Sequence, residues 1–126
     1  VLSACPGVQI IWDPACAIIE HDERPIDSGL ALQRWIRHVH IKDLSHENGS
    51  WTPVLTGEGS MPLNEIRSVT EKIGYSGFLS FEWEKKWHPS IEAAEIAVPH
   101  FANWFRTHWS VLGPEHKLDA VQGGKR

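Results

Sequence analysis

The chain has 126 residues, of which 41% are hydrophobic and 22% charged, and its net charge is −4 with neutral histidines. This length suits one domain with one core, and the acidic balance argues against a nucleic-acid partner. No apolar stretch approaches the roughly 20 residues of a membrane-spanning helix, so we expect no membrane partner. The only cysteines are Cys5 and Cys16, which favour a reducing, cytoplasmic compartment over a disulfide scaffold.

The first predicted strand covers residues 8–13 and stops before Pro14. Asp13 lies at its C-terminal end, where a parallel sheet presents functional side chains. Alternatively, Asp13 caps a helix or turn, because Asp before Pro commonly initiates a turn. Residues 17–26 are predicted as a loop, and a helix is expected to begin near Asp27 and to lead directly into the second strand.

The second predicted strand is the segment HVHIKD, whose polar and apolar residues alternate. Val39 and Ile41 are expected to face a packed layer. The opposite face would carry His38, His40 and Lys42. Two imidazoles and an ammonium are costly to bury unless a metal or a polar substrate satisfies them. The alternative is a half-exposed strand whose polar face meets water.

The middle of the chain predicts a loop, an extended stretch, a turn and a helix. Residues 45–50 form a polar loop, residues 51–55 are short and extended, and the glycines of residues 57–59 make a flexible turn. Apolar residues then recur every three to four positions over residues 62–73, which indicates an amphipathic helix. Gly74 is expected to end it.

The third predicted strand is residues 77–84, GFLSFEWE. Alternation places Ser80, Glu82 and Glu84 on one face. Two carboxylates on one face repel each other unless a cation or a proton separates them. A water-facing acidic stripe is the alternative, and the strand's place after a helix weakens it, because such alternation implies a sheet covered on both faces.

The last part of the chain predicts a loop, a long helix and a tail. The loop carries Trp87, and Ser90 is expected to cap the helix. Pro99 should kink this helix or divide it into two. Residues 110–126 are polar and glycine-rich and are predicted as a flexible tail, which leaves residues 1–109 as the folded domain.

The order of strands and helices predicts an α/β fold with a parallel sheet, in which all strand ends meet at one edge. Asp13, His40 and Glu82 would converge there. A site with both nitrogen and oxygen ligands suits one divalent ion, which could be Mn²⁺, Zn²⁺ or Co²⁺. Imidazole argues against Mg²⁺ alone, although Mg²⁺ stays in the candidate set.

Four blocks, IIWDP, HVHIKD, GEGSMPL and GFLSFEWE, together resemble the sugar isomerase and epimerase group of xylose isomerase-like TIM barrels. The resemblance covers roughly residues 7–105. It implies about three C-terminal βα units of a partial (β/α)8 barrel, because a complete barrel needs about 250 residues. We therefore expect a C-terminal fragment of a longer protein, whose open sheet edges would favour a homo-oligomer or aggregation.

The resemblance also implies a site and a reaction. Three of the four family metal ligands correspond to Asp13, His40 and Glu82, and the fourth, a Glu, would come from an earlier strand. The reaction would transfer a proton next to the carbonyl of a sugar or sugar phosphate through an enediolate, with the metal stabilising the developing charge. Glu82 would be the catalytic acid or base.

The residues predicted to contact the substrate are Cys16, His38, Lys42, Glu84 and Trp87. Cys16 departs from the family pattern, because members often carry a substrate-contacting His at this position. Lys42 either holds a substrate oxygen or pairs with Glu84. His38 lies one step deeper, a position that favours a structural role over substrate contact.

Three other functions remain compatible with the sequence. A metal-dependent lyase or dehydratase would share the same site. An endonuclease-IV-like phosphodiesterase would need more ligands and a basic DNA-binding face, which the net charge disfavours. A sugar-binding remnant without turnover is the non-enzymatic alternative. The number of bound ions separates these functions, because one ion favours the isomerase, three the nuclease and none the remnant.

Overall fold

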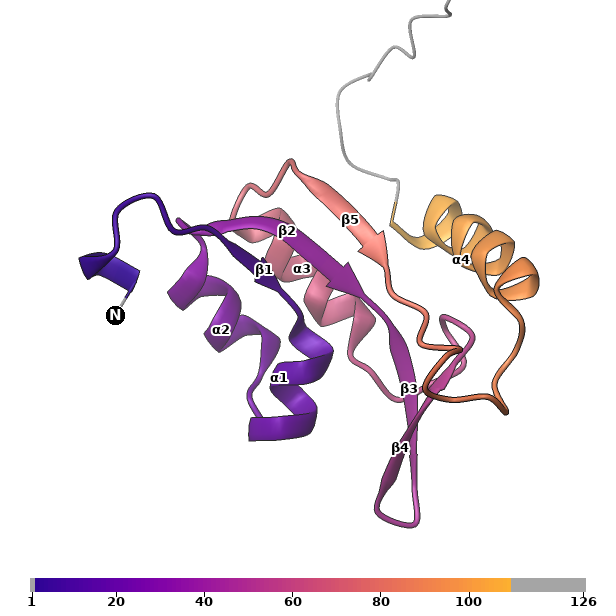
Figure 1. Ribbon diagram of the computed structural model, residues 1–126. Coiled ribbons are helices and arrows are strands. Elements are labelled where there is room, and N and C mark those ends of the chain that lie inside the picture. The colour runs from indigo at the N-terminus through magenta and orange to yellow at the C-terminus, as the bar shows by residue number, and fades with distance from the viewer. Residues whose placement is uncertain (1, 110–126) are drawn as a thin grey trace, which may run out of the picture.

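The computed structural model describes residues 2–109 (Figure 1), so the predicted tail at residues 110–126 lies outside the described part. The helices are a short 3-10 helix at Leu2–Ala4, α1 at Pro14–His21, α2 at Pro25–Leu32, α3 at Leu63–Lys72 and α4 at Ala94–His108. The strands are β1 at Ile10–Trp12, β2 at Ile36–Ile41, β3 at Asp43–Glu47, β4 at Ser50–Val54 and β5 at Phe78–Phe81.

A three-stranded sheet with the order β1-β2-β5 forms the centre of the fold. Both strand pairs are parallel, as the sequence predicted. In the register, Ile11 lies beside His38, and His40 lies beside Ser80. The amide of Glu82 donates to the carbonyl of Ile41 at 3.0 Å, so the pairing of β2 with β5 continues one residue beyond the strand. The carboxyl ends of all three strands therefore meet at one edge.

The two faces of this sheet differ in what covers them. Val39 and Ile41 point into the core and are 0% and 1% exposed, which confirms the packed face that alternation predicted. Burying each such side chain contributes about 1.5–3 kcal/mol. Figure 1 shows α1, α2 and α3 on one side of the sheet. On the opposite face, Ile11 and Phe78 are 59% and 82% exposed.

Helix α2 approaches the sheet closely through Gly29. A Cβ atom at this position would collide with the side chain of Val69 in α3 and would lie 3.2 Å from the Trp12 ring in β1. The Trp12 indole also donates to the Ser28 hydroxyl at 3.1 Å. This contact joins α2 to the strand that ends at Asp13, and so supports one side of the site.

The loop predicted at residues 17–26 is wrong except for residues 22–24, because α1 extends through His21 and α2 begins at Pro25. Pro14 suits the first position of a helix, where its missing N–H costs nothing. The Asp13 carboxylate caps this helix by accepting from the amide of Cys16 at 3.0 Å. The Asp-Pro pair therefore marks a helix start immediately after the strand.

The polar loop predicted at residues 45–50 is also wrong, because β3 and β4 form an antiparallel hairpin there. Asn48 and Gly49 make its turn with φ angles of 50° and 78°. Asn-Gly is the preferred pair for a two-residue hairpin whose central residues both need positive φ. His46 stacks on Trp51 across the hairpin at 4.4 Å between ring centroids.

The remaining helices agree with the sequence except in detail. Helix α3 lies within the predicted range 62–73. Helix α4 begins at Ala94 and not at Ser90, and it runs unbroken through Pro99, so the predicted division is wrong. Pro99 lies in the second turn and removes a single backbone hydrogen bond there, which the helix tolerates. Among residues 2–109, no helix is long and apolar enough to cross a membrane.

Candidate metal and substrate site

Three side chains from distant parts of the chain meet at the carboxyl edge of the sheet. Asp13 directly follows β1, His40 lies near the end of β2, and Glu82 directly follows β5. Each offers one potential ligand atom, and these atoms all lie within 4.8 Å of one another. These are the three residues that the sequence predicted as metal ligands.

The imidazole of His40 contacts Glu82 directly, with 3.2 Å between Nδ1 and Oε2. Both side chains are about one-third exposed, so they face an accessible space. Below His40 on the same strand, His38 lies edge-on to it, with 5.5 Å between ring centroids. His38 Nε2 is 2.6 Å from the Ser80 hydroxyl, so Ser80 is a partner that sequence reasoning had not singled out.

Lys42 lies between the two carboxylates of this group. Its Nζ is 3.0 Å from Asp13 Oδ2 and 3.0 Å from Glu82 Oε2, and its side chain is only 5% exposed. Burial alone would lower the pKa of Lys42, but the hydrogen bonds and charges of the two carboxylates outweigh burial, and the pKa is raised well above its usual range. Glu84, the alternative partner, is instead 3.8 Å from His88.

Asp13 combines the helix cap with the ion pair. Burial acts to raise its pKa, but the hydrogen bonds from the Cys16 amide and thiol and from Lys42 lower it overall. The Cys16 thiol donates to Asp13 Oδ2 at 3.1 Å and accepts from Lys42 at 3.3 Å. Burial and the Asp13 charge raise the pKa of this thiol. Cys16 therefore supplies a neutral donor at the position where the family resemblance implies a histidine in other members.

The donor set fits a divalent ion. Ligand atoms about 2.0–2.2 Å from an ion lie up to about 4.4 Å apart, so a separation within 4.8 Å needs only small side-chain movements. Two carboxylates and one imidazole suit Mn²⁺, Zn²⁺ or Co²⁺. The buried ammonium of Lys42 also indicates a cation site, because both carboxylates are directed at the position that this cation occupies.

The other residues predicted to contact a substrate lie in the loop after β5. Glu84 accepts backbone hydrogen bonds from Trp87 and His88 through its carbonyl, which closes a turn. Trp87 is 68% exposed, and the Lys86 ammonium lies 4.7 Å from its ring centroid. This exposed aromatic ring is available to a ligand, but it makes no described contact with Asp13, His40 or Glu82.

Asp43 is a further important residue to which the sequence analysis assigned no role. It is 2% exposed and follows Lys42 directly. Its carboxylate accepts from the amides of Gly57 and Gly59 at 2.8 and 2.9 Å, and from Met61 at 3.2 Å. A Cβ on Gly59 would collide with this carboxylate, so glycine is needed there. An acid at the strand end followed by a Gly-x-Gly turn is the signal that could have indicated it.

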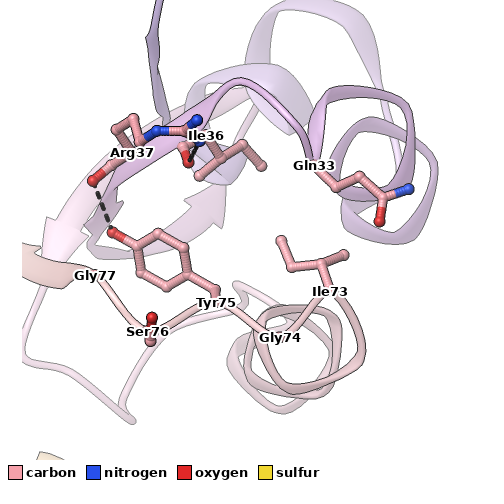
Figure 2. Close-up of a pocket in the computed structure, with 8 residues that line it drawn as sticks. All are labelled: Gln33, Ile36, Arg37, Ile73, Gly74, Tyr75, Ser76 and Gly77. Carbon is pink, nitrogen blue, oxygen red and sulfur yellow. Dashed lines mark hydrogen bonds between the residues drawn. The ribbon is translucent and has the colours of Figure 1, made fainter.

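A hollow at the opposite edge of the sheet has a different character. A cavity of about 340 Å³ opens beside the start of β2, and Figure 2 shows Tyr75 directed across it toward Arg37. The Tyr75 hydroxyl, which has one hydrogen to donate, lies 2.7 Å from the carbonyl oxygen of Phe78 and 3.2 Å from that of Arg37, and burial raises its pKa. Catalytic groups of α/β barrels lie at the carboxyl edge of the sheet, so we assign this cavity no catalytic role.

We expect the stabilising effect of Asp13 to disappear in acid. Its lowered pKa means that the unfolded chain takes up a proton first, so its contribution is complete above about pH 5 and is lost as the pH falls through the folded value. Asp13→Asn keeps the cap but loses the charge beside Lys42, and should cost about 1–3 kcal/mol at pH 7. Urea unfolding of both proteins from pH 7 to pH 3 measures this.

The exposed Asp27 provides the matched control. The Asp27→Asn variant should stay within about 0.5 kcal/mol of the wild type at pH 7. An Asp13→Asn cost that is the same at pH 3 as at pH 7 would show that the carboxylate charge is not what stabilises this corner.

Comparison with known proteins identifies the fold. The family model described as xylose isomerase-like TIM barrel matches residues 2–107. A crystal structure of a xylose isomerase domain protein from Planctomyces limnophilus superposes with a TM-score of 0.63 at 25% identity, over 82% of this chain. The apo structure of 3-keto-D-glucoside 4-epimerase from E. coli gives 0.54 at 24% identity, over 79% of this chain. These matches confirm the α/β fold of a partial TIM barrel.

One curated protein also matches in sequence. It is the alpha subunit of a C-glycoside deglycosidase from Arthrobacter globiformis, which is 37% identical over 65 residues, or 51% of this chain. The chain spans only part of each of these proteins. It covers 16% of the deglycosidase subunit, 37% of the Planctomyces protein and 34% of the epimerase.

Proposed function

This chain belongs to the xylose isomerase-like TIM barrel family, and on that premise we propose that it carries most of the metal site of a sugar isomerase or epimerase. The observation that supports this proposal best is the meeting of Asp13, His40 and Glu82, whose ligand atoms lie within 4.8 Å of one another. They meet at the carboxyl edge of the strands, where barrels of this kind perform their chemistry.

Asp13, His40 and Glu82 would hold one divalent ion, either Mn²⁺, Zn²⁺, Co²⁺ or Mg²⁺. When bound, such an ion polarises a substrate carbonyl and stabilises negative charge that develops on its oxygen. The orientation of the ligands comes from the fold. Asp13 is held by the Cys16 amide, and His40 and Glu82 hold each other across neighbouring strands.

Glu82 is the proposed acid or base. Its side chain is 28% exposed, so a substrate can reach it, and it would take a proton from the carbon next to the carbonyl and deliver it to the former carbonyl carbon of the enediolate. The neighbouring ammonium of Lys42 donates a hydrogen bond to this carboxylate at 3.0 Å, so Glu82 is held at the position where the substrate would meet it.

The substrate class we propose is a sugar or sugar phosphate. The proposed contacts are Cys16, His38, Lys42, Glu84 and Trp87. Hydroxyl and phosphate oxygens match the ammonium and imidazole donors, and exposed tryptophan suits the apolar face of a sugar ring. The deglycosidase relative, which its name describes as acting on C-glycosides, supports a carbohydrate ligand.

The first test is metal stoichiometry. Metal-free protein titrated with Mn²⁺ in a calorimeter should bind one ion per chain. Asp13→Asn and His40→Ala should each weaken binding by at least about tenfold, because each loses one ligand. His21→Ala, which removes an exposed imidazole at the end of α1, should bind like the wild type.

The reaction is tested in deuterated water with Mn²⁺-loaded protein and a set of aldoses, ketoses and their phosphates. The proposal expects deuterium to enter the substrate at the carbon next to the carbonyl, as NMR would detect. A dehydrated product would instead indicate lyase chemistry. Absence of bound metal from the wild type would contradict the proposal, and three ions per chain would favour a phosphodiesterase.

A further inference from the structure

The ammonium of Lys42 touches the same two carboxylates that would bind a divalent ion. It donates to Glu82 at 3.0 Å, lies 3.0 Å from Asp13 Oδ2, and is 3.3 Å from the Cys16 sulfur. The side chain is 5% exposed, so water does not share these contacts to a large extent. Lys42 is therefore a cation built into the ligand cluster.

We propose that Lys42 is a tethered cation that holds Asp13 and Glu82 together before a divalent ion binds, and that the ion must displace it from both carboxylates. This inference rests on the metal centre proposed above. Nothing in the family match assigns this role to Lys42. The proposed role sets an order of events at the site, in which binding of the ion releases the ammonium.

Lys42 balances the charges of the two carboxylates at short range. Without Lys42, the carboxylates of Asp13 and Glu82 would lie close together in a partly buried site, where like charges repel each other. A divalent ion would neutralise this repulsion as well as the ammonium does. Both cations cannot keep the same contacts, because they draw on the same oxygen lone pairs and repel each other strongly at a few ångströms.

The backbone at Lys42 is fixed, whereas its side chain can change rotamer once its contacts with the carboxylates are lost. Ile41 and Asp43 on either side are 1% and 2% exposed, and Asp43 is held by three amides of the loop after β4. The long lysine side chain has several rotatable bonds and can redirect its ammonium. A displaced ammonium would remain at the rim of the site, where it can donate to a substrate oxygen.

The experiment compares Mn²⁺ affinity in the wild-type chain and in Lys42→Met, which keeps an unbranched side chain only one atom shorter but removes its charge. Free Mn²⁺ is measured by electron paramagnetic resonance. Lys42→Met should bind Mn²⁺ at least about tenfold more tightly than the wild type, because the competitor is gone. Its thermal stabilisation by Mn²⁺ should also be larger than that of the wild type.

Lys86→Met is the control for the loss of one positive charge near the site. The Lys86 ammonium lies over the Trp87 ring and makes no described contact with either carboxylate. This variant should change Mn²⁺ affinity by less than about twofold, since an exposed charge is well screened. If Lys42→Met and Lys86→Met gained Mn²⁺ affinity equally, the gain would be a general effect of net charge, and the proposed displacement of Lys42 would be overturned.

The outcomes separate this inference from the proposed function. If the wild type binds one Mn²⁺ and Lys42→Met binds it equally or more weakly, Lys42 is no competitor and the inference alone fails. If neither protein binds Mn²⁺, the metal centre fails and the inference fails with it.

A second measurement covers a Lys42→Met variant that does not fold. Lysine acetylation in the wild type, followed by mass spectrometry, should modify Lys42 several-fold faster with Mn²⁺ than without it, because an ion-paired ammonium is a poor nucleophile. Lys72, which is exposed at the end of α3, gives the reference rate. An unchanged Lys42 rate at saturating Mn²⁺ would overturn the displacement.

Discussion

Replacing Asp43 with alanine is expected to lower the free energy of unfolding by about 3–5 kcal/mol, which is a large fraction of the stability of a small domain. The Asp43 carboxylate is buried and accepts hydrogen bonds from the amides of Gly57, Gly59 and Met61. Alanine would leave these amides without their acceptor at a place with little access to water. Urea unfolding followed by tryptophan fluorescence would measure the loss.

Asparagine and a neighbouring acid make the comparison sharper. Asp43→Asn keeps one acceptor oxygen, which can serve Gly57 and Gly59, but it faces Met61 with an amide group, so its cost should be intermediate. Glu58 lies exposed in the same loop, and Glu58→Ala should cost no more than about 0.5 kcal/mol. Equal costs for Asp43→Ala and Glu58→Ala would show that the buried carboxylate does not hold the loop.

The effect of Asp43 reaches the site because Lys42 precedes it directly. The loop it holds follows β4 and leads into α3, and this loop contains the GEGSMPL block of the family resemblance. Asp43 therefore gives this block a physical role, since the glycines let backbone amides approach the carboxylate closely. A substitution here should disturb the position of Lys42 as well as the stability of the fold.

The sheet and the meeting point of its strand ends could be predicted from sequence because both depend on simple periodicity. Alternation in HVHIKD separates Val39 from His40, and parallel strands bring their carboxyl ends to one edge. The placement of Asp13, His40 and Glu82 at one point follows from these two facts. It does not depend on any residue between the strands.

The parts that sequence reasoning missed depend on local signals that have two meanings. Asp13 before Pro14 indicates either a turn or a capped helix, and the structure shows the helix. The polarity of residues 45–50 predicts a loop, although the Asn48-Gly49 pair within it is the strongest short signal for a hairpin. Composition alone does not decide between these alternatives.

The contacts of Lys42 could not be predicted from periodicity, because they depend on distances between strands. Alternation places Lys42 on the same face as His40, but the choice between Asp13, Glu82 and Glu84 as partner needs the register of β2 with both neighbours. The structure shows the first two as partners. Side-chain pairing across a sheet is thus the level of detail at which the sequence ceases to be informative.

Replacing Glu82 with glutamine is expected to reduce turnover of the proposed reaction by a factor of about 10²–10⁴, because an amide cannot take up a proton at neutral pH. The amide oxygen still offers a weaker ligand, so part of the metal occupancy should remain. Turnover is measured as deuterium entry into the substrate at saturating Mn²⁺. Bound Mn²⁺ is measured on the same samples.

Glu92→Gln serves as the matched control, since Glu92 is exposed in the segment before α4 and its described contact is made by its backbone carbonyl. Its turnover should equal that of the wild type. Undiminished isomerisation by Glu82→Gln would remove Glu82 from the proton transfer even if the metal site proved correct. Lost turnover together with fully lost metal would leave Glu82 as a ligand only. The proposed acid–base role therefore requires that turnover falls much further than metal occupancy, because only then does the carboxylate do more than bind the ion.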